Sequence, residues 1–126
     1  MKQFGFSLVE LVVTIMIIIT LSLISGPIYK SYSLKAKQAE GYALLGTIRA
    51  AEDNYYREWR EFFKGGTETC NDVVLGIDAR HNKYYTKFDS EIYNWGANAY
   101  CAVAYGNGVK NLTMSYRMSE PCSIWS

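Results

Sequence analysis

The pattern of hydrophobic and polar positions divides the chain into three stretches. Residues 6–28 form a mostly apolar run that contains one acidic residue and scattered serines and threonines. Because a membrane-spanning helix needs about 20 residues, this run is long enough to cross a bilayer. From residue 42 to residue 63 apolar side chains recur at helical spacing, which predicts that one helix continues to the glycines at 65 and 66.

The second stretch has an apolar stripe that we expect to face a core, with Glu52 and the other charged residues on the opposite, solvated side. The stripe comprises Tyr42, Leu44, Leu45, Ile48, Ala51, Tyr55, Trp59, Phe62 and Phe63.

The third stretch has the alternation of strands. Residues 111–118 alternate strictly between apolar and polar side chains, which is typical of a half-buried antiparallel strand. Residues 83–89 and 98–105 also suit strands, whereas residues 67–82 read as a loop with a short helical turn at most. In the middle strand we expect one apolar face made of Ala99, Cys101, Val103 and Tyr105. The sequence therefore predicts an α+β fold, in which one long N-terminal helix packs on a small antiparallel sheet of about three strands.

Glu10 is the only charged residue between Phe4 and Tyr29. A carboxylate costs roughly 2.5–3.5 kcal/mol on insertion scales at the bilayer centre, and less near an interface. An ionisable group in such a run is a functional hypothesis by default and needs a partner. We expect that partner to be an α-amino group, which favours a membrane-anchored subunit that assembles over an enzyme.

Gly26 and Pro27 interrupt the apolar run. Pro27 has no N–H to bond the carbonyl of Leu23, and Gly26 adds backbone freedom. We therefore predict a helix break, seen as a kink or a locally weak stretch, between Thr20 and Pro27. A cleavable secretory signal is disfavoured, because the run exceeds the usual apolar region of about 7–15 residues.

Charge and composition limit the remaining function classes. The chain has 126 residues and a net charge of +1, so it is long enough for one domain and has no bulk electrostatic reason to bind nucleic acid. Lys30, Lys35 and Lys37 cluster just after the apolar run. They form either a solvated helix stripe or a contact with lipid headgroups or a neighbouring subunit. By the positive-inside tendency this flank would lie in the cytoplasm.

No residue constellation suggests catalysis or a bound metal. His81 is the only histidine and lies in a polar segment that we expect to be exposed. No triad spacing surrounds it, and the cysteines contain no C-x-x-C pair. We predict no enzymatic activity, no metal site and no cofactor.

The three cysteines, Cys70, Cys101 and Cys122, suggest one disulfide bridge and one leftover thiol. One bridge among three cysteines allows three connectivities, and a small domain outside the cytoplasm would gain most from it.

The string Gly5-Phe6-Ser7-Leu8-Val9-Glu10 resembles the cleavage motif of type IV pilins and of the pseudopilins of type II secretion. Pro27 stands where these proteins have a proline in the membrane helix. The predicted architecture is similar to the pilin-like fold. The resemblance implies a leader at residues 1–5, a transmembrane and filament-core helix at 6–28, and an amphipathic helix half with a globular head at 29–126.

The resemblance also implies a processing and assembly route. A prepilin peptidase would cut after Gly5 and methylate the new N-terminus at Phe6. Glu10 would then pair with the amino terminus of an adjacent subunit in a homo-oligomeric helical filament. A buried charge is tolerable only when it is paired, and the first turn of a helix favours an anion. An inner-membrane assembly platform would be a further partner.

Two other regions resemble family features. The stretch from about Ile19 to Pro27 matches the part of pilins that loses helical structure in assembled filaments. Cys101 and Cys122 resemble the pair that bounds the C-terminal loop of many pilins, which leaves Cys70 as the extra thiol. The pairings of Cys70 with Cys101 or with Cys122 stay open.

The leading interpretation is the major pilin of a type IV pilus. The precursor would lie in the bacterial inner membrane and the product in an extracellular filament. The first alternative is a type II secretion pseudopilin or a minor pilin, and a pseudopilin would end in a periplasmic pseudopilus. A membrane-anchored binding module that never polymerises is the alternative from a different class. The filament's role in adhesion, motility, secretion or DNA uptake is not encoded in the subunit plan.

Overall fold

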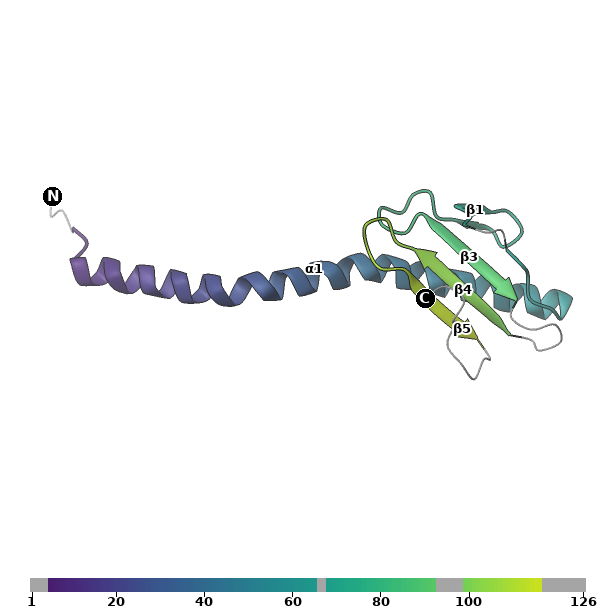
Figure 1. Ribbon diagram of the computed structural model, residues 1–126, viewed down its shortest axis with the longest axis horizontal. Coiled ribbons are helices and arrows are strands. Elements are labelled where there is room, and N and C mark those ends of the chain that lie inside the picture. The colour runs from purple at the N-terminus through teal and green to yellow at the C-terminus, as the bar shows by residue number, and fades with distance from the viewer. Residues whose placement is uncertain (1–4, 66–67, 93–98, 117–126) are drawn as a thin grey trace. The chain divides into compact units, whose positions relative to one another are not determined.

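The computed structural model describes residues 5–65, 68–92 and 99–116 of the chain (Figure 1). The chain forms two compact units, Met1–Lys35 and Ala36–Ser126. The first contains the N-terminal part of helix α1, and the second contains the rest of α1 and two antiparallel sheets. This arrangement confirms the predicted α+β, pilin-like fold class. The elements are α1 (Leu8–Trp59), β1 (Asn71–Asp72), β2 (Ile77–Asp78), β3 (Lys87–Ile92), β4 (Tyr100–Tyr105) and β5 (Leu112–Tyr116).

The larger sheet has the strand order β3-β4-β5. Phe88 of β3 is paired with Ala104 of β4, which is paired in turn with Leu112 of β5. The outer edge of β3 is partly covered, because Thr69 exchanges two backbone hydrogen bonds with Phe88 at 2.8 and 3.0 Å. Covering an edge in this way satisfies backbone groups that would otherwise offer a template for another strand.

The core of the second unit lies between α1 and one face of this sheet. Helix positions Leu44, Leu45 and Ile48 are buried, as the apolar stripe predicts. Their partners on the strands and loops include Tyr85, Phe88, Tyr100, Ala102, Ala104 and Leu112. The alternation predicted for residues 111–118 is confirmed in β5, where Leu112 is buried and Met114 and Tyr116 are partly buried against the same core. The last apolar position of that range, Met118, lies outside the described residues.

The apolar face expected on β4 is not the face that packs on α1. Tyr100, Ala102 and Ala104 belong to the core cluster with α1. Cys101 and Val103 lie on the opposite face of the sheet, because successive side chains of a strand alternate between its faces. All of these residues are buried. A strand buried on both faces reads as a continuous apolar run, so alternation could not identify the helix-facing side.

The predicted helix end was also wrong, because α1 ends at Trp59 and does not reach the glycines. Arg60 adopts a positive φ of 60°, and its N–H donates to the carbonyl of Tyr56 at 2.8 Å. This left-handed residue ends the helix and turns the chain back. The Phe62 ring then stacks on Tyr56 with centroids 4.7 Å apart. Phe62 is therefore buried although it lies after the end of the helix. Trp59, which we expected in the buried stripe, is 61% exposed.

Residues 67–82 contain a short hairpin instead of the expected loop, since β1 pairs with β2. The carboxylate Oδ1 of Asp72 accepts the N–H groups of Val74 and Leu75 at 3.0 and 3.1 Å. Gly76 follows with a positive φ of 68°. Such an Asx turn followed by a left-handed glycine fixes a tight reversal, which a propensity reading could not separate from a helical turn.

Gly41 is a point of close approach between α1 and the rest of the second unit. A Cβ atom at this buried position would lie 2.7 Å from Cδ1 of Leu112 and 2.8 Å from Cζ of Tyr85. The Tyr85 ring cannot easily yield, because its hydroxyl donates to the carbonyl of Lys110 at 2.9 Å. Gly41 is thus required by packing and not by backbone conformation.

We expect Gly41→Ala to lower the free energy of unfolding of the second unit by about 1–3 kcal/mol through over-packing. The matched control is Gly46→Ala, which lies in the same helix with nothing within 4 Å. That substitution should stabilise by roughly 0.5–1 kcal/mol through helix propensity. Thermal unfolding of both variants, followed by circular dichroism in detergent micelles, would check the opposite signs. Equal effects would contradict the close approach.

Candidate functional site

The site begins where α1 begins. Residues 5–7 are not helical, and Leu8 starts the helix. The N–H of Glu10 donates to the hydroxyl of Ser7 at 3.3 Å, so Ser7 acts as the N-cap residue. Gly5 is exposed, and a Cβ atom added there would meet nothing within 4 Å. The bond after Gly5 therefore lies in an exposed, non-helical segment, and the helix cap lies wholly on its C-terminal side.

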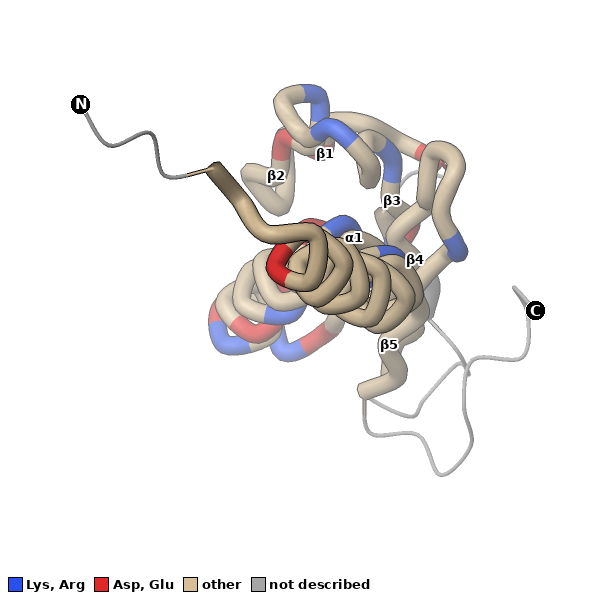
Figure 2. The backbone as a smooth tube through the Cα atoms, turned by 90° about the vertical axis from the view of Figure 1, so that its left-hand side faces the viewer, with Lys and Arg blue, Asp and Glu red and all other residues tan. Residues whose placement is uncertain are grey.

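Glu10 sits in the first turn of α1 and is exposed. Its backbone atoms are used, since its carbonyl accepts the hydroxyl of Thr14. Within the part of the chain that the structure describes, its carboxylate has neither a hydrogen bond nor an ion pair. In Figure 2 the front turns of α1 are tan apart from red near the start. The Ser7–Glu10 spacing also fits a capping box, but only the serine half is formed.

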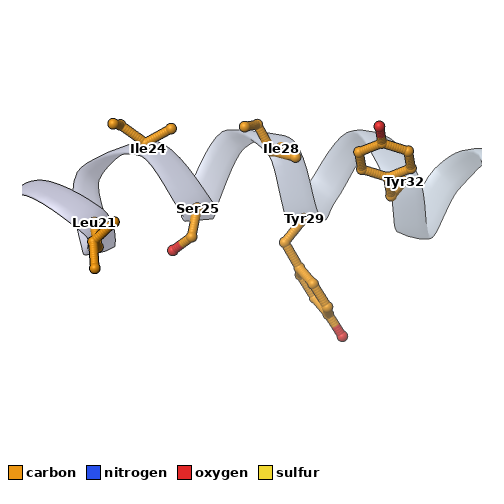
Figure 3. A pocket seen from close by; sticks show the side chains of 6 residues that line it. All are labelled: Leu21, Ile24, Ser25, Ile28, Tyr29 and Tyr32. Atoms are coloured by element: carbon orange, nitrogen blue, oxygen red, sulfur yellow. The ribbon is translucent and has the colours of Figure 1, made fainter.

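The apolar surface around Glu10 is uncovered. The helix is apolar enough to cross a membrane, and none of its most hydropathic window is buried. Its exposed apolar side chains extend from Leu8 through Ile28. A groove along this face is lined by Leu21, Ile24, Ser25, Ile28, Tyr29 and Tyr32, all from the one helix (Figure 3). Exposed apolar patches of this kind mark an interaction with protein or lipid.

The expected weak stretch is helical in the structure, and α1 runs continuously through Gly26 and Pro27. Its hydroxyl side chains bond backward to the helix: Ser22 donates to the carbonyl of Ile18 at 2.7 Å, and Ser25 to that of Ser22 at 3.2 Å. Such bonds compete with the helical ladder and slightly destabilise it. The predicted weakness of this stretch and its loss of helical structure in an assembled filament both stay predictions.

Glu52 is buried, so the prediction that it lies on the solvated side of the helix was wrong. Its side chain is 0% exposed. The backbone N–H of Phe63 donates to Oε2 at 2.9 Å, and the hydroxyl of Ser90 donates to Oε1 at 3.1 Å. Glu52 thus joins α1 to the returning chain and to β3. Its position four residues after Ile48 was the signal available in the sequence.

Burial raises the pKa of Glu52 to about 7. The hydrogen bonds from Phe63 and Ser90 oppose this shift, whereas the nearby carboxylates of Asp72 and Asp53 add to it. Desolvation disfavours the ionised form of any carboxyl group, so the desolvation cost exceeds what two hydrogen bonds return.

Glu40 has the opposite electrostatic balance. Its Oε1 accepts the N–H groups of Tyr84 and Tyr85 at 2.7 and 3.0 Å. Burial raises its pKa, but the hydrogen bonds from Tyr85, Tyr84 and Lys83 together lower it below the ordinary value. Glu40 therefore holds the segment before β3 as an ionised acceptor.

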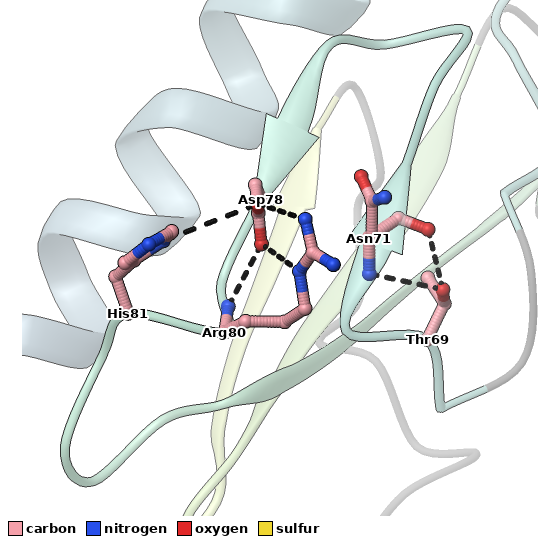
Figure 4. A network of polar contacts seen from close by, with 5 residues as sticks. All are labelled: Thr69, Asn71, Asp78, Arg80 and His81. Carbon is pink, nitrogen blue, oxygen red and sulfur yellow. Dashed lines mark hydrogen bonds and ion pairs between the residues drawn. The ribbon is translucent and has the colours of Figure 1, made fainter.

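A separate polar network closes the β1–β2 hairpin (Figure 4). Arg80 donates to both carboxylate oxygens of Asp78, at 2.9 and 2.6 Å, which holds the pKa of Asp78 far below its usual range. Nδ1 of His81 lies 4.0 Å from the same carboxylate, with its side chain 88% exposed. Beside them, Thr69 and Asn71 bond each other at 2.7 and 3.2 Å. Surface contacts of this kind contribute little and bring no nucleophile to His81.

The cysteines fall in different surroundings. Cys70 is an exposed free thiol, and Cys101 is buried on β4. Cys122 lies outside the described residues, so its pairing with Cys101 stays a prediction. Among the described residues no group of three or more potential metal ligands gathers.

A curated relative, the "Fimbrial protein EcpC" of Eikenella corrodens, is 31% identical over 83 residues. These residues are 66% of this chain and 50% of that protein, so the chain spans about half the length of the curated relative. No protein-family model and no solved structure matches the chain. The likeness supports a pilin-like family, in agreement with the N-terminal resemblance.

We expect the stability of the second unit to fall as the pH rises from about 4.5 to about 7. The folded state holds the Glu52 proton more tightly than the unfolded state, so its contribution is complete below the unfolded pKa of 4.5 and is lost as the pH passes through about 7. The change from 4.5 to about 7 corresponds to about 3 kcal/mol. Melting temperatures across this range would measure it.

Glu52→Gln should flatten this pH dependence, because the amide keeps an acceptor for Phe63 and does not titrate. Glu58→Gln, at an exposed position of the same helix, is the control and should keep the wild-type slope. Identical slopes in all three proteins would show that Glu52 titrates normally.

Proposed function

We propose that the chain is the major pilin, the structural subunit of a type IV pilus filament. One observation carries this proposal: a lone carboxylate without a described partner, in the first turn of a helix whose apolar surface the chain leaves uncovered. Membrane lipid can cover the apolar surface before assembly, and neighbouring helices can cover it in a filament. The similarity to a fimbrial protein supports a pilus-type subunit that is not an enzyme.

The assembly step follows from the cost of an unpaired charge. Cleavage after Gly5 would create an ammonium group at Phe6, next to the helix start. The helix dipole disfavours a cation there, and an apolar filament core disfavours any unpaired charge. Pairing that ammonium with Glu10 of an adjacent subunit removes both penalties and fixes the axial register between copies.

The same subunit plan fits a type II secretion pseudopilin or a minor pilin, which differ in where the processed chain collects. Prepilin peptidase and an inner-membrane platform are the partners that the proposal requires. The stretch from about Ile19 to Pro27 would lose helical structure on assembly, aided by its hydroxyl back-bonds and by the N–H that Pro27 lacks. The different-class alternative, a module that never polymerises, requires neither cleavage nor pairing.

We expect Glu10→Val to leave membrane insertion intact and to reduce sheared filament yield at least roughly ten-fold, because losing one member of a buried pair costs about 3–5 kcal/mol. Thr14→Val, one turn further along the same helix, removes a polar group that bonds only to the backbone and should assemble normally. A wild-type filament yield from the Glu10 variant would contradict the pairing mechanism.

We expect filaments sheared from cells to contain a chain that begins at methylated Phe6, as measured by intact mass and the N-terminal peptide. Gly5→Leu should block this processing and leave the chain starting at Met1. Processed protein found only in the envelope fraction would favour the pseudopilin or minor pilin. An unprocessed wild-type chain would favour the non-polymerising module.

A further inference from the structure

The structure divides the lysine cluster that follows the apolar run. The ammonium of Lys37 lies 5.4 Å from the ring centroid of Tyr84 in the second unit. Lys30 and Lys35, in the first unit, are exposed and form no ion pair with any described residue. Lys35 instead lies 5.8 Å from the ring centroid of Tyr32. Two cations are therefore left without a counter-charge at the end of the apolar segment.

Two exposed tyrosines accompany these lysines. Tyr29 is 74% and Tyr32 is 68% exposed, and both line the groove described above (Figure 3). Helical residues advance by about 100° each. Relative to Tyr29, the directions of Lys30, Lys35 and Tyr32 are therefore about 100°, 240° and 300°. The residues encircle the helix, whereas one protein neighbour would contact only one side.

The depth of these residues fits a headgroup layer. Leu8–Ile28 is about 31 Å long at ~1.5 Å per residue, which matches a hydrocarbon core of about 30 Å. Tyr29 and Lys30 then emerge at its boundary, where tyrosine is enriched in membrane proteins. Lys35 lies about 10 Å beyond Ile28 at the same rise, and a long aliphatic stem lets a lysine reach back toward the phosphates.

We propose that Tyr29, Lys30, Tyr32 and Lys35 form a membrane-surface collar that binds the phosphate groups of anionic lipids before assembly. The proposal rests on the membrane-anchored precursor inferred above. It gives a role to cations that the positive-inside tendency disfavours on a translocated flank. Lipid surrounds a single helix on every side, as the spread of the collar requires.

The test uses the full chain reconstituted in phosphatidylcholine vesicles that contain a trace of spin-labelled phosphatidylglycerol or spin-labelled phosphatidylcholine. The fraction of motionally restricted label measures which lipid lies against the protein. We expect a preference for phosphatidylglycerol of roughly five-fold per collar lysine at low salt, weakened by added salt.

The variant Lys30→Gln with Lys35→Gln should lose this preference, and Lys30→Arg with Lys35→Arg should keep it. Lys87→Gln with Lys110→Gln removes the same charge from the head and should also keep it. Equal preference in the collar and head variants would overturn the collar. So would a preference that phosphate salt abolishes but chloride of equal ionic strength does not, because the lysines would then bind free phosphate.

A chain that fails to insert into the vesicles would overturn the membrane anchor and the collar together. Insertion without a lipid preference would overturn the collar alone. The two failures are therefore distinguishable in one preparation.

Discussion

The apolar surface of the first half of α1 is the constraint on which the rest of the structure depends. A fully buried aliphatic side chain contributes about 1.5–3 kcal/mol relative to an exposed one, and the exposed apolar side chains from Leu8 to Ile28 forgo this gain. The second unit packs its sheet against helix positions from Gly41 to Glu52. The sheet therefore covers only the C-terminal part of the helix. The apolar side chains of the N-terminal part must be covered by lipid or by another protein.

Three glutamates on this helix show how the environment decides the role of one side-chain type. Glu40 accepts two backbone N–H groups and is held ionised. Glu52 also accepts two hydrogen bonds, but its full burial beside other carboxylates raises its pKa to about 7. Glu10 has no described partner. Glu40 and Glu52 connect the helix to the rest of the second unit through hydrogen bonds. The carboxylate of Glu10 has no hydrogen bond or ion pair with any described residue.

The sequence predicted the features that have a clear period or a strong physical anomaly. The long helix follows from its hydrophobic pattern, β5 from strict alternation, and Glu10 from a single charge in an apolar run. The errors arose where tertiary contacts decide. The left-handed residue Arg60 ended the helix early, and β4 is buried on both faces, so neither local propensity nor alternation could find them. Glu52 was missed because a charge on a helix is usually solvated, although its spacing from Ile48 placed it on the buried face.

The geometry of the first turn of α1 is compatible with the proposed removal of a leader. Ser7 caps the helix through its own hydroxyl, so the helix start does not need residues 1–5. Removal of a leader would therefore leave the cap intact and change only the charge beside it. The ammonium that the proposed cleavage creates would lie at the end of the helix where the dipole is least favourable for a cation, so a carboxylate would be a stabilising neighbour. The Glu10 carboxylate is exposed and has no hydrogen bond or ion pair with any described residue. It could therefore pair with the ammonium group of another copy, as the proposed assembly requires.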